Sequence, residues 1–240
     1  MEKQISIKTP DGHIIYGILD SPEEKSDKLV IFVHGFTGNC NEHIFFNGAK
    51  YLRKQSIASF RFDLYSWQKK ARAFPDCTTE THVLDLRTVY NYLHNEYSQI
   101  YLIGHSWGGI VVLESKLDVS GIILWDSAHP DCPFTEREYE YNKALNAYLL
   151  KWGLVFLVGK KMHDQTMKIK PARDLISGIH SPLKVICAGR GELIKGGREY
   201  CDLAKEPKSF AIIEGAGHTF DEEGTEKKLF EETANWLKEF

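Results

Sequence analysis

The stretch Gly104-His105-Ser106-Trp107-Gly108-Gly109 decides the fold, because it places a serine between two glycines in the pattern G-x-S-x-G. Residues 100–104 before it are typical of a strand, and residues 108–117 after it are typical of a helix. A serine on such a sharp strand-to-helix turn needs small neighbours two residues away on each side. Its hydroxyl would then be exposed at a helix N-terminus, which favours developing negative charge. The motif predicts a nucleophilic serine, and a glycine-rich connecting turn is the simpler alternative.

Strand-like and helix-like segments alternate on both sides of this motif. Runs rich in apolar and β-branched residues predict strands at residues 14–19, 29–33, 57–64, 119–125, 183–188 and 210–213. Apolar residues recur at helical spacing from Val83 to Leu93, and again in a final helix that contains Leu229 and Trp236. Parallel strands need crossover connections and are buried on both faces. The alternation therefore predicts an α/β fold with a mostly parallel sheet.

The alternation is interrupted between Trp125 and Leu183, where helix-like sequence runs over residues 139–158. We expect a single domain, residues 1–240, with an insertion at about residues 128–180 that lies above the sheet. From Lys143 to Arg173 there are seven basic residues and one acidic residue. The insertion also contains an apolar and aromatic segment, residues 148–157. This segment either packs over the sheet with solvated lysines beside it, or binds an apolar substrate group while Lys160 and Lys161 attract anionic esters.

Composition restricts the class of protein. The chain has 240 residues, of which 42% are hydrophobic and 26% charged, as in ordinary globular proteins. A net charge of −3 argues against a nucleic-acid partner. The five cysteines have neither a CxxC pair nor a zinc-binding spacing, so reduced thiols in a cytoplasmic protein are expected, without a metal. The sequence shows no signal peptide and no transmembrane segment, and it does not indicate the oligomeric state.

A serine needs a general base, and the base needs an acid to orient it. His218 follows the predicted strand 210–213, so a parallel sheet would bring it to the same edge as Ser106. Glu192 follows the strand 183–188 and is our first candidate for the acid, because it gives the order Ser, acid, His. Asp126, at the end of the strand 119–125, is the alternative. The simpler interpretation of His218 is a loop residue that caps the final helix. The carboxylate that does not contact His218 would be an ordinary loop or helix-capping residue.

Acyl transfer also requires donors for an oxyanion. One donor is expected to be the backbone N–H of Trp107, which follows the serine. The other is expected to be the N–H of Phe36, in the segment His34-Gly35-Phe36-Thr37-Gly38 that follows an early strand. In this segment the backbone N–H would bind the oxyanion, and the His34 side chain would only orient the segment or pack in the interior.

Together these segments resemble the α/β-hydrolase superfamily, in its esterase and lipase-like serine hydrolase branch. The resemblance extends over nearly the whole chain, and residues 34–39 and 58–63 look most like small bacterial carboxylesterases that include cinnamoyl (feruloyl) esterases. It implies an eight-stranded, mostly parallel sheet with helices on both faces, a small helical lid after the sixth strand, and an acyl-enzyme mechanism without a cofactor. A glutamate stands where most members have an aspartate, which keeps Asp126 as the alternative acid.

The predicted activity is hydrolysis of a small-molecule carboxylic ester by a Ser-His-acid triad. His34, Gly35, Trp152 and Phe156 are candidate substrate-binding residues. A thioesterase, a monoacylglycerol lipase, a peptidase and a carbon–carbon bond hydrolase share this triad and stay open as alternatives. A non-catalytic ligand-binding member of the fold is the alternative from another class of protein, although such a protein has no need of all three triad residues.

Overall fold

Eight strands form the central sheet, in the order β1-β2-β4-β3-β5-β6-β10-β11. The structure is a computed structural model that describes residues 1–239. Within that range, β2 runs in the opposite direction to the other seven strands of this sheet. The strands are β1 (Glu2–Lys8), β2 (Ile14–Asp20), β3 (Lys28–Val33), β4 (Ala58–Phe62), β5 (Gln99–His105), β6 (Gly121–Trp125), β10 (Leu183–Ala188) and β11 (Lys208–Ile213). The predicted mostly parallel sheet is confirmed.

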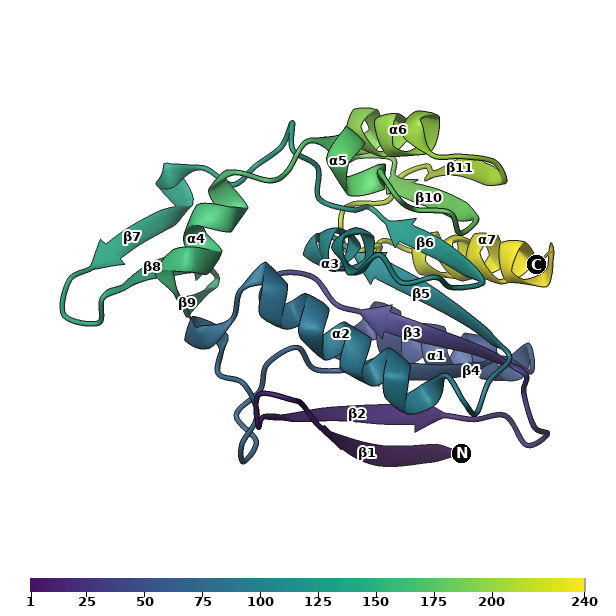
Figure 1. Ribbon diagram of the computed structural model, residues 1–240. Helices are drawn as coiled ribbons and strands as arrows, with labels where there is room; N and C mark the ends of the chain where they lie inside the picture. Colours follow the sequence, from purple (N-terminus) through teal and green to yellow (C-terminus); the bar gives the residue numbers. More distant parts are fainter. Residues whose placement is uncertain (240) are drawn as a thin grey trace.

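Helices cover both faces of the sheet (Figure 1). Alternation along β3 explains the two layers, because Leu29 and Ile31 pack into one apolar cluster while Val30 and Phe32 pack into the other. The first cluster includes residues of α2, α3, α5 and α6, and the second includes residues of α1 and α7. The helices are α1 (His43–Lys54), α2 (Thr79–Leu93), α3 (Trp107–Ser115), α4 (Lys160–Met167), α5 (Ala172–Ile176), α6 (Ile194–Leu203) and α7 (Thr225–Glu239), with short 3-10 helices η1 (Phe74–Asp76) and η2 (Glu136–Glu138).

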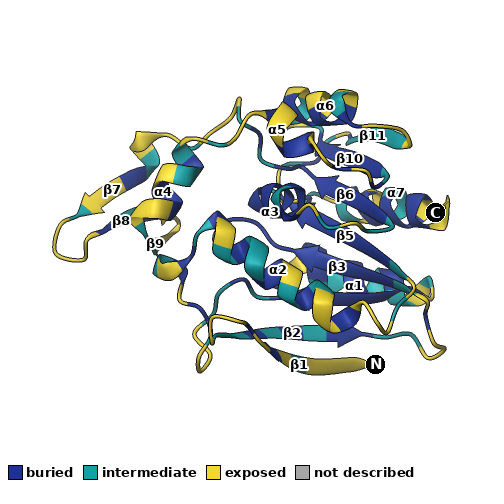
Figure 2. Cartoon of the chain, in the orientation of Figure 1, coloured by how far each residue is buried: buried dark blue, intermediate teal, exposed yellow. Residues whose placement is uncertain are grey.

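Burial falls from the centre of the sheet to its edge at β1 (Figure 2). The five residues of β6 are all buried, whereas β1 has one buried residue, Ile7. The polar sequence of β1 gives no strand signal in advance, and it pairs with β2 over seven positions. None of the helices within residues 1–239 is long and apolar enough to span a bilayer.

The insertion between β6 and β10 contains a second sheet of three antiparallel strands. These strands are β7 (Tyr139–Asn142), β8 (Ala147–Trp152) and β9 (Leu154–Val158). The helix predicted over residues 139–158, and with it a wholly helical lid, is therefore wrong. Asn146 and Gly153 have φ values of 48° and 71°, which suit the turns between short strands and end any helix. In Figure 1 this sheet projects from the side of the main sheet at which β3 ends.

The insertion is fastened to the main body through α4 and the start of α2. Gln165 accepts a hydrogen bond from the backbone N–H of Thr79 at 2.9 Å and donates one to Glu80 at 2.8 Å. Lys161 Nζ lies 3.3 Å from the other oxygen of Glu80. Although burial alone would raise the pKa of Glu80, its hydrogen bonds lower that pKa to about 2. The carboxylate is thus stabilised in its charged form at the N-terminus of α2.

Candidate active site

Ser106 lies on the turn between β5 and α3 and has φ 54° and ψ −123°. This positive φ is rare for a residue with a side chain, and such backbone strain is concentrated at functional sites. The turn needs glycine at position 108, because a Cβ there would lie 2.2 Å from the Val33 carbonyl oxygen. The Ser106 N–H donates to Trp125 O at 3.1 Å, and the Ser106 carbonyl accepts from Ala128 N at 3.0 Å. Both bonds tie the serine backbone to the end of β6.

His218 lies on the loop after β11 and contacts an acidic side chain. Its Nδ1 is 2.6 Å from Oδ2 of Asp126, which is 0% exposed. The other carboxylate oxygen of Asp126 accepts a hydrogen bond from the backbone N–H of Ala188 at 3.0 Å. Since an ionised carboxylate only accepts hydrogen bonds, His218 Nδ1 carries the proton. Nε2 is then the ring nitrogen that can take up a proton.

The acid beside His218 is therefore Asp126, and our first choice of Glu192 is not what the structure shows. Glu192 is exposed, and its carboxylate forms no hydrogen bond to any of residues 1–239. The sheet order explains this difference: Asp126 directly follows β6, next to β5, whereas Glu192 lies four residues beyond the end of β10. A Cβ at Gly191 would lie 3.4 Å from Asp126 Oδ2, so the loop that carries Glu192 passes directly over this carboxylate.

Two side chains that the sequence analysis did not single out hold the His218 loop. His105 Nε2 lies 2.8 Å from the carbonyl oxygen of His218, to which it donates. Burial, with a smaller effect of His218, lowers the pKa of His105 to about 3, so its ring is neutral. Glu222 accepts a hydrogen bond from the Gly217 N–H at 2.8 Å. His105 belongs to the G-x-S-x-G motif itself, which is the signal that could have identified it.

The segment after β3 lies against the serine. A Cβ at Gly35 would lie 2.9 Å from the Ser106 Cβ, so only a glycine permits this approach. His34 is buried, accepts a hydrogen bond from Leu64 N at its Nε2, and donates from Nδ1 to Gly35 O at 2.8 Å. Burial lowers the pKa of His34, which agrees with a neutral ring in this role. The His34 side chain orients the segment and does not line the cavity beside Ser106.

Two backbone donors at this place have no acceptor within the described chain. Trp107 is the first residue of α3, so its N–H has no partner in that helix. The N–H of Phe36 likewise forms no hydrogen bond within residues 1–239. Trp107 directly follows Ser106, and Phe36 belongs to the segment after β3 that contacts Ser106. Unpaired N–H donors at such positions suit a developing oxyanion.

A cavity of about 480 Å³ lies over Ser106 and His218. Three aromatic rings, those of Phe36, Phe134 and Trp152, line it, and their centroids are 5.0 to 6.2 Å apart. Phe156 does not line the cavity, contrary to expectation, and its ring packs at 6.1 Å from Phe74 instead. The residues around the cavity are Gly35, Phe36, Thr37, Glu42, His105, Ser106, Asp126, Ala128, Cys132, Phe134, Trp152, Gly191, Glu192, Leu193, His218 and Thr219.

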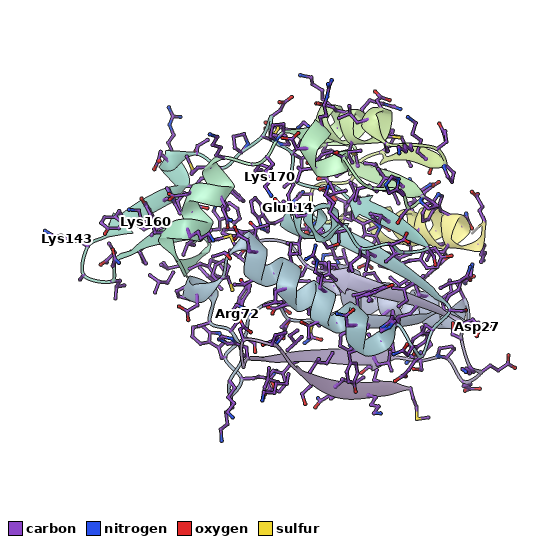
Figure 3. All side chains as sticks on the ribbon, in the orientation of Figure 1. Asp27, Arg72, Glu114, Lys143, Lys160 and Lys170 are labelled. Carbon is purple, nitrogen blue, oxygen red and sulfur yellow. The ribbon has the colours of Figure 1, made fainter. Side chains whose placement is uncertain are left out.

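The basic residues of the insertion lie away from this cavity. In Figure 3, Lys143 and Lys160 are on the outer part of the insertion, and Lys170 lies beside Glu114, to which it is bonded at 2.6 Å. Lys161 pairs with Glu80. None of these lysines lines the cavity, so the solvated-lysine interpretation of this segment fits the structure better than attraction of anionic esters.

One cluster elsewhere has side chains of the kind that bind metals. Atoms of His129, Asp131 and Glu199 lie within 4.8 Å of one another. The Asp131 N–H donates to His129 Nδ1 at 3.2 Å, which places the ring proton on Nε2, the nitrogen that faces Glu199. Lys195 Nζ lies 3.5 Å from Asp131 and supplies a positive charge there. The protonated nitrogen and this lysine do not suit a cation, so the cluster is not a metal site in this arrangement.

Comparison with known proteins agrees with the fold. A search of curated proteins finds no match. Among solved structures, Est1E from Butyrivibrio proteoclasticus with ferulic acid bound is similar with a TM-score of 0.81 and 19% identity, over 98% of both chains. The alpha/beta hydrolase GrgF from Penicillium sp. sh18 has a TM-score of 0.80 and 16% identity, over 100% of this chain and 98% of that chain.

The esterase domain of a Rhodothermus marinus protein has a TM-score of 0.76 and 19% identity, over 100% of this chain and 98% of that chain. At such identities the solved structures show the fold. The family itself is shown by sequence, since the model of the alpha/beta hydrolase family matches residues 30–177, more than half of the chain. This chain is a member of the alpha/beta hydrolase family.

Proposed function

We propose that the protein is a serine hydrolase that cleaves carboxylic esters through an acyl-enzyme intermediate. The observation that carries this proposal is the 2.6 Å contact between His218 and the buried Asp126, on the cavity that also exposes Ser106. A buried carboxylate that fixes the tautomer of an imidazole, on the same cavity as a strained serine, is the arrangement that activates a hydroxyl nucleophile. In this proposal Asp126 takes the place that we first gave to Glu192.

In the first half of the reaction, His218 Nε2 accepts the Ser106 proton as Oγ attacks the ester carbonyl carbon. The carbonyl oxygen becomes negative and accepts hydrogen bonds from the N–H groups of Phe36 and Trp107. Protonated His218, stabilised by Asp126, then gives its proton to the departing alcohol. The acyl group stays on Ser106.

In the second half, water enters the cavity and His218 removes a proton from it as its oxygen attacks the acyl carbon. The same two N–H groups again hold the oxyanion. When this second intermediate collapses, Ser106 leaves with the proton from His218, and the carboxylic acid is released. No step needs a redox group, because only acyl and proton transfers occur.

The aromatic wall of Phe36, Phe134 and Trp152 supports an aromatic or apolar group on the ester. The related Est1E was solved with ferulic acid bound, which makes a cinnamate-type ester a fitting test substrate. Since Phe134 and Trp152 come from the insertion at about residues 128–180, we assign that insertion the role of a lid within a single domain.

The test compares wild type with Ser106→Ala on p-nitrophenyl acetate, butyrate and octanoate and on a cinnamate-type ester. We expect kcat to fall by about 10⁴-fold or more, because the nucleophile is lost. Ser177→Ala, which removes an exposed hydroxyl on α5's C-terminal side, is the matched control and should keep wild-type rates. A fluorophosphonate should label wild type and not Ser106→Ala. Ester hydrolysis that persists in Ser106→Ala would contradict the proposal.

A further inference from the structure

The charges around the cavity are all of one sign. Among its lining residues in the described chain, Glu42, Asp126 and Glu192 carry formal negative charge, and no lysine or arginine lines the cavity. Asp126 is fully buried and paired with His218. Glu42 and Glu192 are therefore the two carboxylates that a bound substrate meets.

Glu42 is held in place by the segment that contacts Ser106. Its Oε1 would lie 2.9 Å from a Cβ at Gly38, and the backbone N–H of Asn39 bonds to the carboxylate. Burial raises the pKa of Glu42 above its ordinary value, and nearby His43, this hydrogen bond and His218 oppose that rise only in part. Glu42 and His218, the proposed general base, both line the cavity.

Basic side chains in the adjoining segments contact other acids. His43 bonds to Glu226 at 2.8 Å, and Arg190 lies 3.5 Å from Glu222. Lys195 lies 3.5 Å from Asp131. The carboxylates of Glu42 and Glu192 thus have no lysine or arginine ion-pair partner among residues 1–239.

The rings of Phe36, Phe134 and Trp152 line the same cavity. The faces of such rings attract a cation, and most strongly when the cation has lost its water. A carboxylate adds attraction for the same cation, and it repels an anion of the substrate. Aromatic rings together with unpaired carboxylates make a site that discriminates by charge.

We infer that this cavity is selective for esters that carry an ammonium group, primary or quaternary, and discriminates against esters that carry a carboxylate. The ammonium group lies against the aromatic wall and faces Glu42 and Glu192. This inference rests on the proposed esterase activity. It is the opposite of the alternative in which the lysines of the insertion attract anionic esters, and those lysines do not line the cavity.

The same charges act on the product. Hydrolysis releases a carboxylate beside Ser106, and two further carboxylates on the walls repel it. An ester with a positive group on its alcohol part would thus be attracted as substrate, while its acid product would be expelled.

The experiment uses p-nitrophenyl esters of matched length: the neutral pentanoate, the cationic 4-ammoniobutanoate and the anionic hemisuccinate. Choline acetate and the neutral 3,3-dimethylbutyl acetate test the alcohol side. We expect kcat/KM to be highest for the cationic ester, lower for the neutral ester and lowest for the anionic ester. On the acyl or alcohol side that faces the carboxylates, the cationic ester should exceed the neutral one by about tenfold, as for one desolvated cation–π contact. A neutral or anionic ester that is preferred on both sides overturns the inference.

Variants then identify the source of the preference. In Glu42→Gln/Glu192→Gln the ratio of kcat/KM between cationic and neutral esters should fall close to one, and glutamine keeps the acceptor for Asn39 N–H. Glu199→Gln, an exposed glutamate of α6 outside the cavity, should keep the wild-type ratio. A ratio that stays high in the double variant overturns the assignment to these carboxylates.

A binding measurement separates this inference from the proposed function. Benzyltrimethylammonium and phenylacetate are titrated against Ser106→Ala, with tryptophan fluorescence as the readout because Trp152 lines the cavity. Tighter binding of the cation supports the inference even if no ester is hydrolysed, in which case the esterase proposal alone fails. Equal or tighter binding of phenylacetate overturns the inference while ester hydrolysis by wild type still stands.

Discussion

At the scale of single residues, the site depends on which carboxylate contacts His218. Asp126 has φ 40° and no exposed surface, and its two oxygens are bonded to His218 and to the Ala188 amide. Chain order alone favoured Glu192, because both acids follow strands that end at the same edge of the sheet. Which of two such acids contacts the imidazole depends on strand order, and strand order is a long-range property that local sequence does not encode.

Asp126→Asn should lower kcat on a neutral ester by about 10⁴-fold, because an asparagine side chain favours the wrong tautomer of His218. Glu192→Gln should cost less than about tenfold on the same ester. Circular dichroism of both variants checks that they fold. A larger loss from Glu192→Gln than from Asp126→Asn would return the role of the acid to Glu192.

At the scale of elements, regular strands and helices of the main sheet were predictable, and the insertion was not. The strand predicted at residues 183–188 coincides with β10, since a continuous apolar run between turns suits a strand buried on both faces. In the insertion, Tyr148, Leu149 and Leu150 suit a helix and a strand equally well by periodicity. The turns at Asn146 and Gly153, together with pairing between strands, determine the outcome.

The contact between α4 and α2 depends on Gln165, so Gln165→Ala should loosen the insertion without unfolding the main sheet. The variant removes bonds to the Thr79 N–H and to Glu80. We expect faster hydrogen–deuterium exchange in β7, β8, β9 and α4, and unchanged exchange in β5 and β6. Lys168→Ala, at the exposed end of α4, is the matched control. Unchanged exchange in the insertion of Gln165→Ala would show that other contacts hold it.

At the scale of the whole molecule, two carboxylates fasten outlying segments to the body. Glu80 holds α4, and Asp11 joins the turn between β1 and β2 to Arg72, at 3.0 Å. Although burial alone would raise the pKa of Asp11, hydrogen bonds from Thr9 and Arg72 lower that pKa to about 2. Arg72 is also bonded twice to the buried Asp85 of α2, so it connects three separate parts of the chain.

The free energy of unfolding should fall as pH is lowered from about 4.5 to about 2. Both carboxylates have folded-state pKa values of about 2, below their ordinary values of 3.8 and 4.5. Their contribution is therefore present above the ordinary values and is lost on acidification through the folded values. Because both side chains are more than a third exposed, solvent screens each contribution. Urea denaturation across this range measures the slope.

The double variant Asp11→Asn/Glu80→Gln should show a shallower slope over the same pH range, because the two groups no longer titrate. Asp164→Asn, which removes an exposed carboxylate of α4, serves as the control and should keep the wild-type slope. If the double variant and wild type lose stability in parallel, other carboxylates determine the acid response.

The hydrogen bond from the Ala188 amide to Asp126 has a spectroscopic consequence. One oxygen of the Asp126 carboxylate contacts the His218 imidazole, and the other accepts the hydrogen bond from the Ala188 amide. A change of charge on the imidazole therefore alters the electrostatic environment of the Ala188 amide proton. In a nitrogen-correlated NMR spectrum the Ala188 resonance would therefore be sensitive to a change of charge at the His218 ring, in the absence of any substrate. A backbone group of β10, which performs no chemistry, thus serves as a built-in indicator of the site.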